Sequence, residues 1–148
     1  MGIKKTASAL WSGTGATGKG VLNTTNKFFD NTPYSFKTRF ENEDGKLGTN
    51  PEELIAAAHA GCFAMALSFA IAEAGYTADS LHTSATVTLD TVEGGFGITQ
   101  ITLQLDGKVA GMEEAQFTSL AEAAKAGCPI SKALSAVPTS LQITFTKS

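Results

Sequence analysis

The sequence has no clustered charge and very little cysteine, arginine or tryptophan. Its 148 residues carry 11 Lys and Arg against 14 Asp and Glu, a net charge of −3, with no basic block. Proteins whose main partner is nucleic acid use clustered Lys and Arg to neutralise phosphates, so the charge pattern argues against that class. Hydrophobic residues make up 43% of the chain. We therefore expect one domain over residues 1–148 with an ordinary core.

Charge is also missing from residues 54–72, a run long enough to span a bilayer. The run contains His59, Gly61, Ser68 and eight alanines, and no aromatic belt or basic flank brackets it. We therefore predict a helix buried inside a protein, not a membrane span. The first residues contain no apolar segment of the kind found in secretory signals, so we expect a cytoplasmic protein.

Only two cysteines are present, Cys62 and Cys128. A permanent disulfide is not expected in a reducing cytosol, so they are either inert core thiols or a pair that cycles between thiol and disulfide. A structural zinc site uses four ligands. The chain offers only His59 three residues before Cys62, with His82 and Cys128 isolated and no C-x-x-C pair. We expect no metal.

Glycines gather at residues 13–20, which read Gly-Thr-Gly-Ala-Thr-Gly-Lys-Gly. The segment contains G-x-G-x-x-G and nearly matches the phosphate-binding loop, but Gly20 stands where that loop needs Ser or Thr. Both motifs also need a helix directly afterwards, because its N-terminus holds the phosphate. Residues after Gly20 favour a strand. We interpret the segment as a hairpin turn and expect no nucleotide or other cofactor.

Hydrophobic periodicity predicts an α+β fold without strand–helix–strand alternation. Strands are expected at 5–11, 21–29, 34–41, 83–92, 96–105 and 140–146, and helices at 51–74 and 112–126, with a short helix opening at Pro129. Gly94 and Gly95 mark a hairpin turn. The alternation slips between Ile98 and Ile101, which predicts a bulge near Thr99-Gln100.

The long helix has recognisable start and stop signals. Asn50 is a favourable N-cap, Pro51 suits the first helical position, and Glu53 completes a start that resembles a capping box. Gly75 ends the helix. Cys62 then lies about three turns into it.

Cys62 is flanked by small residues, so a substrate could approach its sulfur. The thiolate is the reactive form, and an ordinary thiol with a pKa of about 8.5 is little ionised at neutral pH. The helix dipole fades after the first turn, so a nearby cation is needed. The single arginine, Arg39, suits this role because its guanidinium stays charged when desolvated. The alternatives are an inert buried thiol and a solvated strand arginine.

Glu52 or Glu53 could orient Arg39. Ten residues of helix separate Glu52 from Cys62, a rise of about 15 Å. If both serve one site, the helix must break, Arg39 must span the gap, or another subunit must supply the glutamate. The alternative is that both glutamates only complement the helix dipole.

Cys128 precedes Pro129 and could cap the short helix, where the dipole could lower the pKa of its own thiol. The residues alone therefore leave open which cysteine attacks first. Phe63, Met65 and Phe69 could shape a substrate pocket, or could simply be core residues of the helix.

Three stretches, residues 33–41, 48–67 and 124–131, resemble the osmotically inducible protein C and organic hydroperoxide resistance family (OsmC/Ohr). The most specific block runs from Asn-Pro-Glu-Glu-Leu at 50–54 to His-Ala-Gly-Cys at 59–62. The organic hydroperoxide resistance branch carries its arginine in the N-terminal loop, where this chain has only Lys19. Arg39 within Thr-Arg-Phe-Glu therefore points to the OsmC branch.

The resemblance implies a bacterial thiol-dependent peroxidase of organic hydroperoxides, less efficient on hydrogen peroxide, in oxidative and osmotic stress defence. It matches Cys62 to the peroxidatic cysteine, Cys128 to the resolving cysteine, and Arg39 and Glu52 to the charged pair beside the thiolate.

For the fold, the resemblance implies antiparallel sheets packed around long central helices, in an intertwined homodimer with two sites at the interface. It also implies an external dithiol reductant, which is of the lipoyl type in the sister branch. A redox sensor and a non-enzymatic ligand-binding dimer with inert thiols are the alternative functions.

Overall fold

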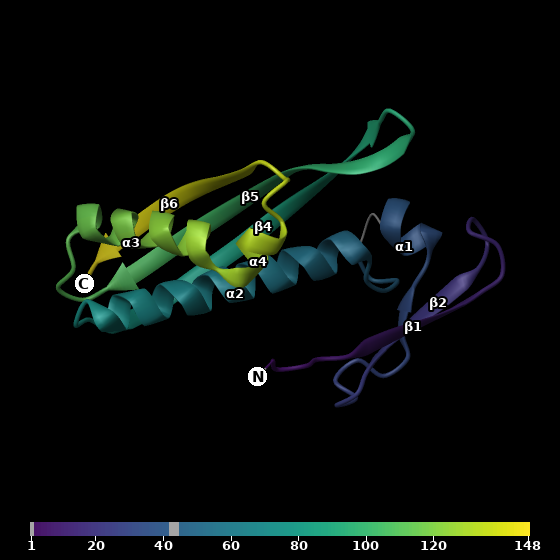
Figure 1. The fold of residues 1–148 in the computed structure, drawn as a ribbon, viewed down its shortest axis with the longest axis horizontal. Coiled ribbons are helices and arrows are strands. Elements are labelled where there is room, and N and C mark those ends of the chain that lie inside the picture. The colour runs from purple at the N-terminus through teal and green to yellow at the C-terminus, as the bar shows by residue number, and fades with distance from the viewer. Residues whose placement is uncertain (1, 42–44) are drawn as a thin grey trace. The chain divides into compact units, whose positions relative to one another are not determined.

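The computed structural model describes residues 2–41 and 45–148, and Figure 1 shows its helices and strands. The chain divides between Leu54 and Ile55 into two compact units, here called the N-terminal and C-terminal units. Each is described by itself. The single domain expected over residues 1–148 stays a prediction.

The N-terminal unit contains one antiparallel sheet in the order β1-β2-β3, formed by Ala7–Ser12, Lys19–Thr24 and Thr32–Tyr34. β1 and β2 pair directly across the glycine-rich segment, which confirms the predicted hairpin turn. Within the described residues, the strand β2 and not a helix directly follows that segment. The second strand ends at Thr24, earlier than predicted. There the Asn26 side chain accepts bonds from the Thr24 hydroxyl and the Phe28 amide and turns the chain.

The strand predicted over residues 34–41 is wrong: β3 ends at Tyr34, and residues Phe36–Phe40 form the short helix α1. Ser35 is its N-cap, and its hydroxyl accepts from the Thr38 amide at 3.2 Å while the Thr38 hydroxyl accepts from the Ser35 amide at 2.7 Å. This reciprocal capping box starts a helix where hydrophobic alternation suggested a strand. Phe36 and Phe40 are also four residues apart, a helical spacing, and their ring centroids lie 4.7 Å apart.

Helix α2 spans Pro51–Glu73, as the start and stop signals predicted. The Asn50 side-chain oxygen accepts from the Glu53 amide at 2.8 Å, which confirms the cap. The Glu53 carboxylate accepts from the Thr49 hydroxyl at 2.7 Å. Gly75, with φ of 90°, adopts the left-handed conformation that ends the helix.

The C-terminal unit holds a second sheet in the order β4-β5-β6, together with helices α3 and α4 (Figure 1). Its elements are β4 (Ala78–Val92), β5 (Gly95–Val109), α3 (Glu114–Gly127), α4 (Pro129–Ala133) and β6 (Thr139–Lys147). β4 and β5 form the predicted antiparallel hairpin. Thr88 pairs with Gln100 and Leu89 pairs with Ile98, which leaves Thr99 as the extra residue of the predicted bulge.

The α+β fold is confirmed, but the expectation of purely antiparallel sheets fails at β6, which pairs with β5 in parallel. β5, α3, α4 and β6 form one strand–helix–strand unit, and the described residues show no regular alternation of such units, as predicted. Helices α3 and α4 carry the chain back along the sheet, so β6 enters in the same direction as β5. A parallel neighbour needs such a crossover, whereas an antiparallel one needs only a turn.

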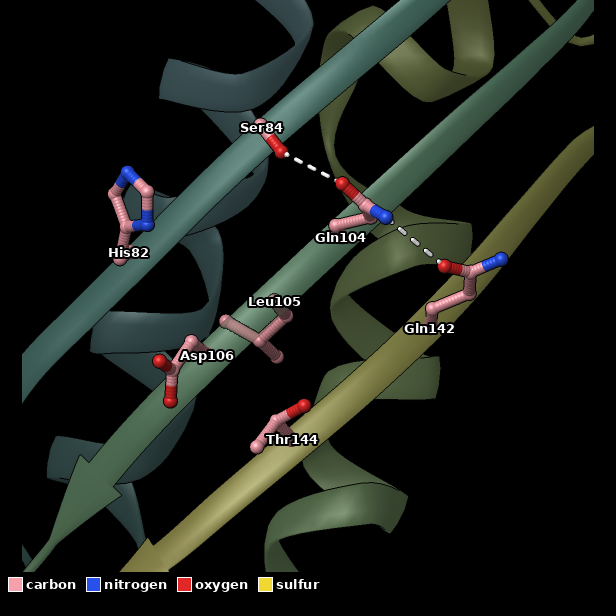
Figure 2. Close-up of a pocket in the computed structure, with 7 residues that line it drawn as sticks. All are labelled: His82, Ser84, Gln104, Leu105, Asp106, Gln142 and Thr144. Carbon is pink, nitrogen blue, oxygen red and sulfur yellow. Dashed lines mark hydrogen bonds between the residues drawn. The ribbon is translucent and has the colours of Figure 1, made fainter.

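The core of the C-terminal unit lies between one face of this sheet and helices α2 and α3. It is formed by Phe63, Leu67, Ile71, Leu103, Leu105, Val109, Met112, Phe117, Ala121, Ala124 and Cys128. The opposite face of the sheet is polar: Figure 2 shows the helices behind the strands and Ser84, Gln104 and Gln142 joined by hydrogen bonds on the near face. This polar face accounts for the alternating pattern of the strands.

Helix α2 is buried along one face only. Phe63, Leu67 and Ile71 are fully buried, whereas Met65 and Phe69 are 64% and 65% exposed. By length and composition it is the one helix of the described residues apolar enough to cross a membrane, and 22% of its most apolar window is buried in the chain. The prediction of a buried helix is therefore met on one face, and the other face is left uncovered within this chain.

Gly107 offers a test of the core. Its position on β5 faces the buried Phe117 ring, and a Cβ there would lie 2.7 and 2.9 Å from two ring carbons. Phe117 in turn stacks on Phe145 with centroids 4.6 Å apart and cannot move freely. We expect Gly107→Ala to lower the free energy of unfolding by about 1–3 kcal/mol through overpacking. Urea unfolding of the reduced protein measures this.

The matched control is Gly15→Ala, because nothing lies within 4 Å of a Cβ at Gly15. It should unfold at nearly the urea concentration of the unaltered chain. Equal stability of Gly107→Ala and Gly15→Ala would contradict the described packing of Phe117 on β5.

Candidate functional site

The two cysteines come together in the C-terminal unit from two different elements. Cys62 is partly buried on α2, and Cys128 is 1% exposed at the N-cap of α4; both are free thiols. The Cys128 sulfur accepts from the Ser131 amide at 3.3 Å, which confirms that Cys128 caps the short helix. A hydrogen bond also joins the two thiols. The packing of α4 beside α2 therefore brings the two sulfurs together.

The surroundings of Cys62 oppose its ionisation. Burial raises the pKa of the Cys62 thiol, and its neighbour Cys128 raises it further, against a smaller lowering by the Ile130 backbone amide. No cation of the described residues contributes to this balance. Because the thiolate is the reactive form of cysteine, a nucleophile at Cys62 would need a positive charge that the described residues of its own unit do not supply.

The surroundings of Cys128 favour its ionisation. Burial opposes it, but hydrogen bonds with the Ser131 side chain and amide, with Cys62 and with the Ile130 amide together lower the pKa of the Cys128 thiol. Donors that stabilise the thiolate outweigh desolvation here. Within the C-terminal unit, Cys128 is therefore the more acidic sulfur of the pair.

Two further residues extend this site: Ser131 contacts Cys128, and His59 contacts Ser131. Sequence reasoning assigned neither of them to the cysteine site. The Ser131 hydroxyl lies 3.1 Å from the Cys128 sulfur and 2.7 Å from His59 Nε2. His59 is fully buried, and burial lowers the pKa of its imidazole. The available signal was spacing: His59 precedes Cys62 by three residues and Ser131 follows Cys128 by three, so each pair shares a helix face or a cap.

The charged pair predicted for the site forms in the N-terminal unit. Arg39 Nε donates to Glu52 Oε2 at 3.1 Å and Arg39 Nη2 donates to Glu52 Oε1 at 2.6 Å. This two-point pairing fixes the plane of the guanidinium. Arg39 is 37% exposed and its carbon Cζ lies 5.4 Å from the Phe40 ring centre. The arginine comes from helix α1, not from the strand that was expected.

The structure therefore assembles the predicted residues as two pairs, Arg39 with Glu52 and Cys62 with Cys128, one in each unit. The carboxylate of Glu53, the other candidate for orienting Arg39, instead accepts a hydrogen bond from the Thr49 hydroxyl. Helix α2 is continuous over Pro51–Glu73, so the helix break considered from the sequence is absent. Among residues 2–41 and 45–148, no three His, Cys, Asp or Glu side chains gather as a metal site.

Comparison with known proteins agrees with the fold. The family model described as OsmC-like protein matches residues 43–142. The chain belongs to the OsmC-like family. Peroxiredoxin OsmC of Escherichia coli strain K12 is 48% identical over 136 residues, which cover 92% of this chain and 93% of that protein.

The organic hydroperoxide resistance proteins among the relatives are less similar. The organic hydroperoxide resistance protein OhrB of Bacillus subtilis strain 168 is 39% identical over 92 residues, 62% of this chain and 65% of that protein. The crystal structure of OhrB of Bacillus subtilis superimposes with a TM-score of 0.74 at 30% identity, covering 94% of this chain and 98% of that one. Similarity to the E. coli protein is higher and extends along the chain, which places this member in the OsmC branch.

His59 makes folding stability depend on pH. Burial lowers its pKa below the ordinary 6.5, so the folded chain keeps it neutral while the unfolded chain takes up a proton. Stability is therefore retained above pH 6.5 and falls as the pH drops below it, with a slope of at most about 1.4 kcal/mol per unit. His59→Gln removes this contribution, which urea unfolding of reduced protein between pH 7.5 and 5.5 detects.

His82→Gln, which removes the exposed histidine of β4, controls for loss of a histidine from the surface. We expect the pH slope to be shallower in His59→Gln than in His82→Gln. Identical slopes in the two variants would show that His59 is not held neutral by the fold.

Proposed function

We propose that this chain reduces organic hydroperoxides with Cys62 as the attacking sulfur and Cys128 as the resolving sulfur. The chain is a cysteine-based, thiol-dependent peroxidase of the OsmC branch. The observation that carries the residue assignment is the hydrogen-bonded contact of two free thiols from separate elements. Two sulfurs in contact can form a disulfide without a large rearrangement of the core around them.

The chemistry has three steps. The Cys62 thiolate attacks the outer peroxide oxygen, the O–O bond breaks, and an alcohol leaves, with a sulfenic acid on Cys62. Cys128 then condenses with the sulfenic acid to give a disulfide and water. An external dithiol reduces the disulfide by thiol–disulfide exchange. Hydrogen peroxide follows the same course and, as a substrate without an apolar group, less efficiently.

The cation missing beside Cys62 is supplied, in this proposal, by Arg39. Its guanidinium keeps its charge when desolvated and can also donate to a peroxide oxygen. Glu52 holds it by two hydrogen bonds, which fixes its direction. Along the unbroken helix α2, ten residues separate Glu52 from Cys62, a rise of about 15 Å. We therefore assign the charged pair beside Cys62 to the partner subunit's Arg39 and Glu52.

A homodimer is the assembly that this assignment needs, and the uncovered face of α2 supports it. Met65 and Phe69 on that face are largely exposed, as are Leu10, Phe28 and Phe96 elsewhere. Met65 and Phe69 lie four residues apart on one helix face, and neighbouring exposed apolar side chains of this kind mark an interaction surface. A second copy would cover the apolar face of α2 and bring apolar side chains near Cys62, which suits organic hydroperoxides. We propose a soluble, cytoplasmic homodimer in stress defence, reduced by a dithiol of the lipoyl type.

Turnover tests the enzymatic assignment against its alternatives. With cumene hydroperoxide and an excess of a small dithiol, we expect many turnovers per chain, and none in Cys62→Ser. A redox sensor would be oxidised once and turn over slowly. Free-thiol content that stays unchanged after a stoichiometric dose of peroxide would indicate inert thiols and contradict the peroxidase.

Subunit mixing tests where Arg39 acts. Arg39→Ala and Cys62→Ser chains, each inactive alone, are co-expressed with different tags and the mixed dimer is purified. If the partner supplies the arginine, the mixed dimer has one complete site and about half the activity of the unaltered dimer. If each chain uses its own Arg39, neither site is complete and the mixed dimer stays inactive, which would overturn the assignment. Arg39→Lys keeps the positive charge but loses the two-point pairing with Glu52, and so tests whether charge alone supports the peroxidase activity.

A further inference from the structure

A continuous series of hydrogen bonds leads away from Cys128 into the core. The Cys128 thiol donates to the Ser131 hydroxyl oxygen at 3.1 Å, and that hydroxyl lies 2.7 Å from His59 Nε2. If Nε2 accepts, every bond runs in the same direction, from S–H to O–H to ring nitrogen. Such a series can pass a proton from the sulfur to the imidazole by two short transfers.

His59 is a polar residue on the buried, otherwise apolar face of α2. The buried face of α2 otherwise consists of apolar residues, Phe63, Leu67 and Ile71, and His59 is as fully buried as they are. Its Nδ1 has no hydrogen-bond partner among the described residues. An unsatisfied buried polar group costs about 1–3 kcal/mol, so packing alone would favour an apolar side chain here.

The imidazole is also in the protonation state that a proton acceptor requires. Burial lowers the pKa of His59, and no charged group adds to this shift. The ring is therefore neutral at neutral pH and has one lone pair free. The lowered pKa of the Cys128 thiol agrees with a proton that leaves the sulfur readily.

We propose that Ser131 and His59 form a proton relay for Cys128, which takes up the thiol proton as Cys128 attacks the sulfenic acid on Cys62. Ser131 touches the reacting sulfur, and His59 acts through Ser131. This inference rests on the proposed function, since it needs a sulfenic acid on Cys62. It assigns to the relay the second step of the reaction, not the attack on peroxide.

The step balances as follows. The Cys128 proton passes to Ser131 Oγ while the Ser131 hydroxyl proton passes to His59 Nε2. The Cys128 sulfur uses the freed electron pair to form the S–S bond, and the S–O bond of Cys62 breaks with its pair on oxygen. The leaving hydroxide takes up one proton and His59 loses one. The sum is sulfenic acid plus thiol giving disulfide plus water.

Rapid-quench mass spectrometry separates the two steps. Reduced protein receives one equivalent of cumene hydroperoxide and is quenched with dimedone and iodoacetamide, which report sulfenic acid, free thiol and disulfide over time. In Ser131→Ala and in His59→Gln we expect unaltered formation of the Cys62 sulfenic acid. Its conversion to the disulfide should slow by about 10- to 100-fold at pH 7, so that the sulfenic acid accumulates.

Two controls distinguish a relay from a structural role. Ser131→Thr keeps a hydroxyl and should restore most of the rate, and Ser135→Ala, which removes an exposed serine just after α4, should have no effect. The rates of Ser131→Ala and His59→Gln should recover as the pH is raised past the pKa of an ordinary thiol, because solvent then removes the proton. A structural defect would not recover in this way.

Disulfide formation at the unaltered rate in both variants, or a slow rate that stays slow at high pH, would overturn the relay. Because the sulfenic acid is measured separately, the result also bears on the proposed function. If the unaltered protein forms no sulfenic acid and no disulfide, the peroxidase proposal fails, and the relay fails with it.

Discussion

The contact between the Cys62 and Cys128 sulfurs is the constraint on which the rest of the site depends. A sulfenic acid on one sulfur can be resolved within the chain only if the other sulfur is adjacent. Here that position follows from packing: Phe63 on α2 and Ala124 on α3 belong to one buried core, and Cys128 caps the helix that follows. The core of the C-terminal unit thus also sets the geometry of the reaction.

Burial also opposes ionisation of both thiols, because it disfavours the charged thiolate. For Cys128, hydrogen bonds from Ser131 outweigh desolvation and lower the pKa of the thiol. For Cys62, desolvation and its neighbour raise the pKa, and no cation of the described residues offsets them. An enzyme that attacks with Cys62 must therefore bring a charge to it on assembly. Formation of a dimer would meet this requirement with Arg39, which Glu52 holds. It would also cover the exposed apolar face of α2.

Much of this arrangement could be predicted from the sequence, where local signals were strong. The Asn50 cap, the Gly75 stop, the bulge at Thr99 and the N-cap role of Cys128 follow from short-range rules, and the structure contains each of them. The residues around Phe36 were misread because aromatic residues four apart suit a helix as well as a strand. Ser35 and Thr38 decided between them through a capping box that uses Thr where Glu or Gln is usual.

Long-range features could not be predicted in the same way. Nothing local to residues 139–147 shows that β6 will run parallel to β5, because direction depends on the crossover through α3 and α4. The contact of His59 with Ser131 joins residues 72 positions apart. The sequence showed His59 only as a possible metal ligand near Cys62, and its present neighbours follow from tertiary packing. Arg39 pairs with Glu52 rather than Glu53, whose carboxylate instead accepts from the Thr49 hydroxyl.

The central claim is the order of the two sulfurs, and one measurement tests it directly. Cys62→Ser and Cys128→Ser proteins each receive one equivalent of organic hydroperoxide, and mass spectrometry follows the remaining cysteine. We expect a sulfenic acid on Cys62 in the Cys128→Ser protein and a thiol that stays reduced on Cys128 in the Cys62→Ser protein. A sulfenic acid on Cys128, with Cys62 left reduced, would contradict it and make the more acidic thiol of the isolated unit the nucleophile.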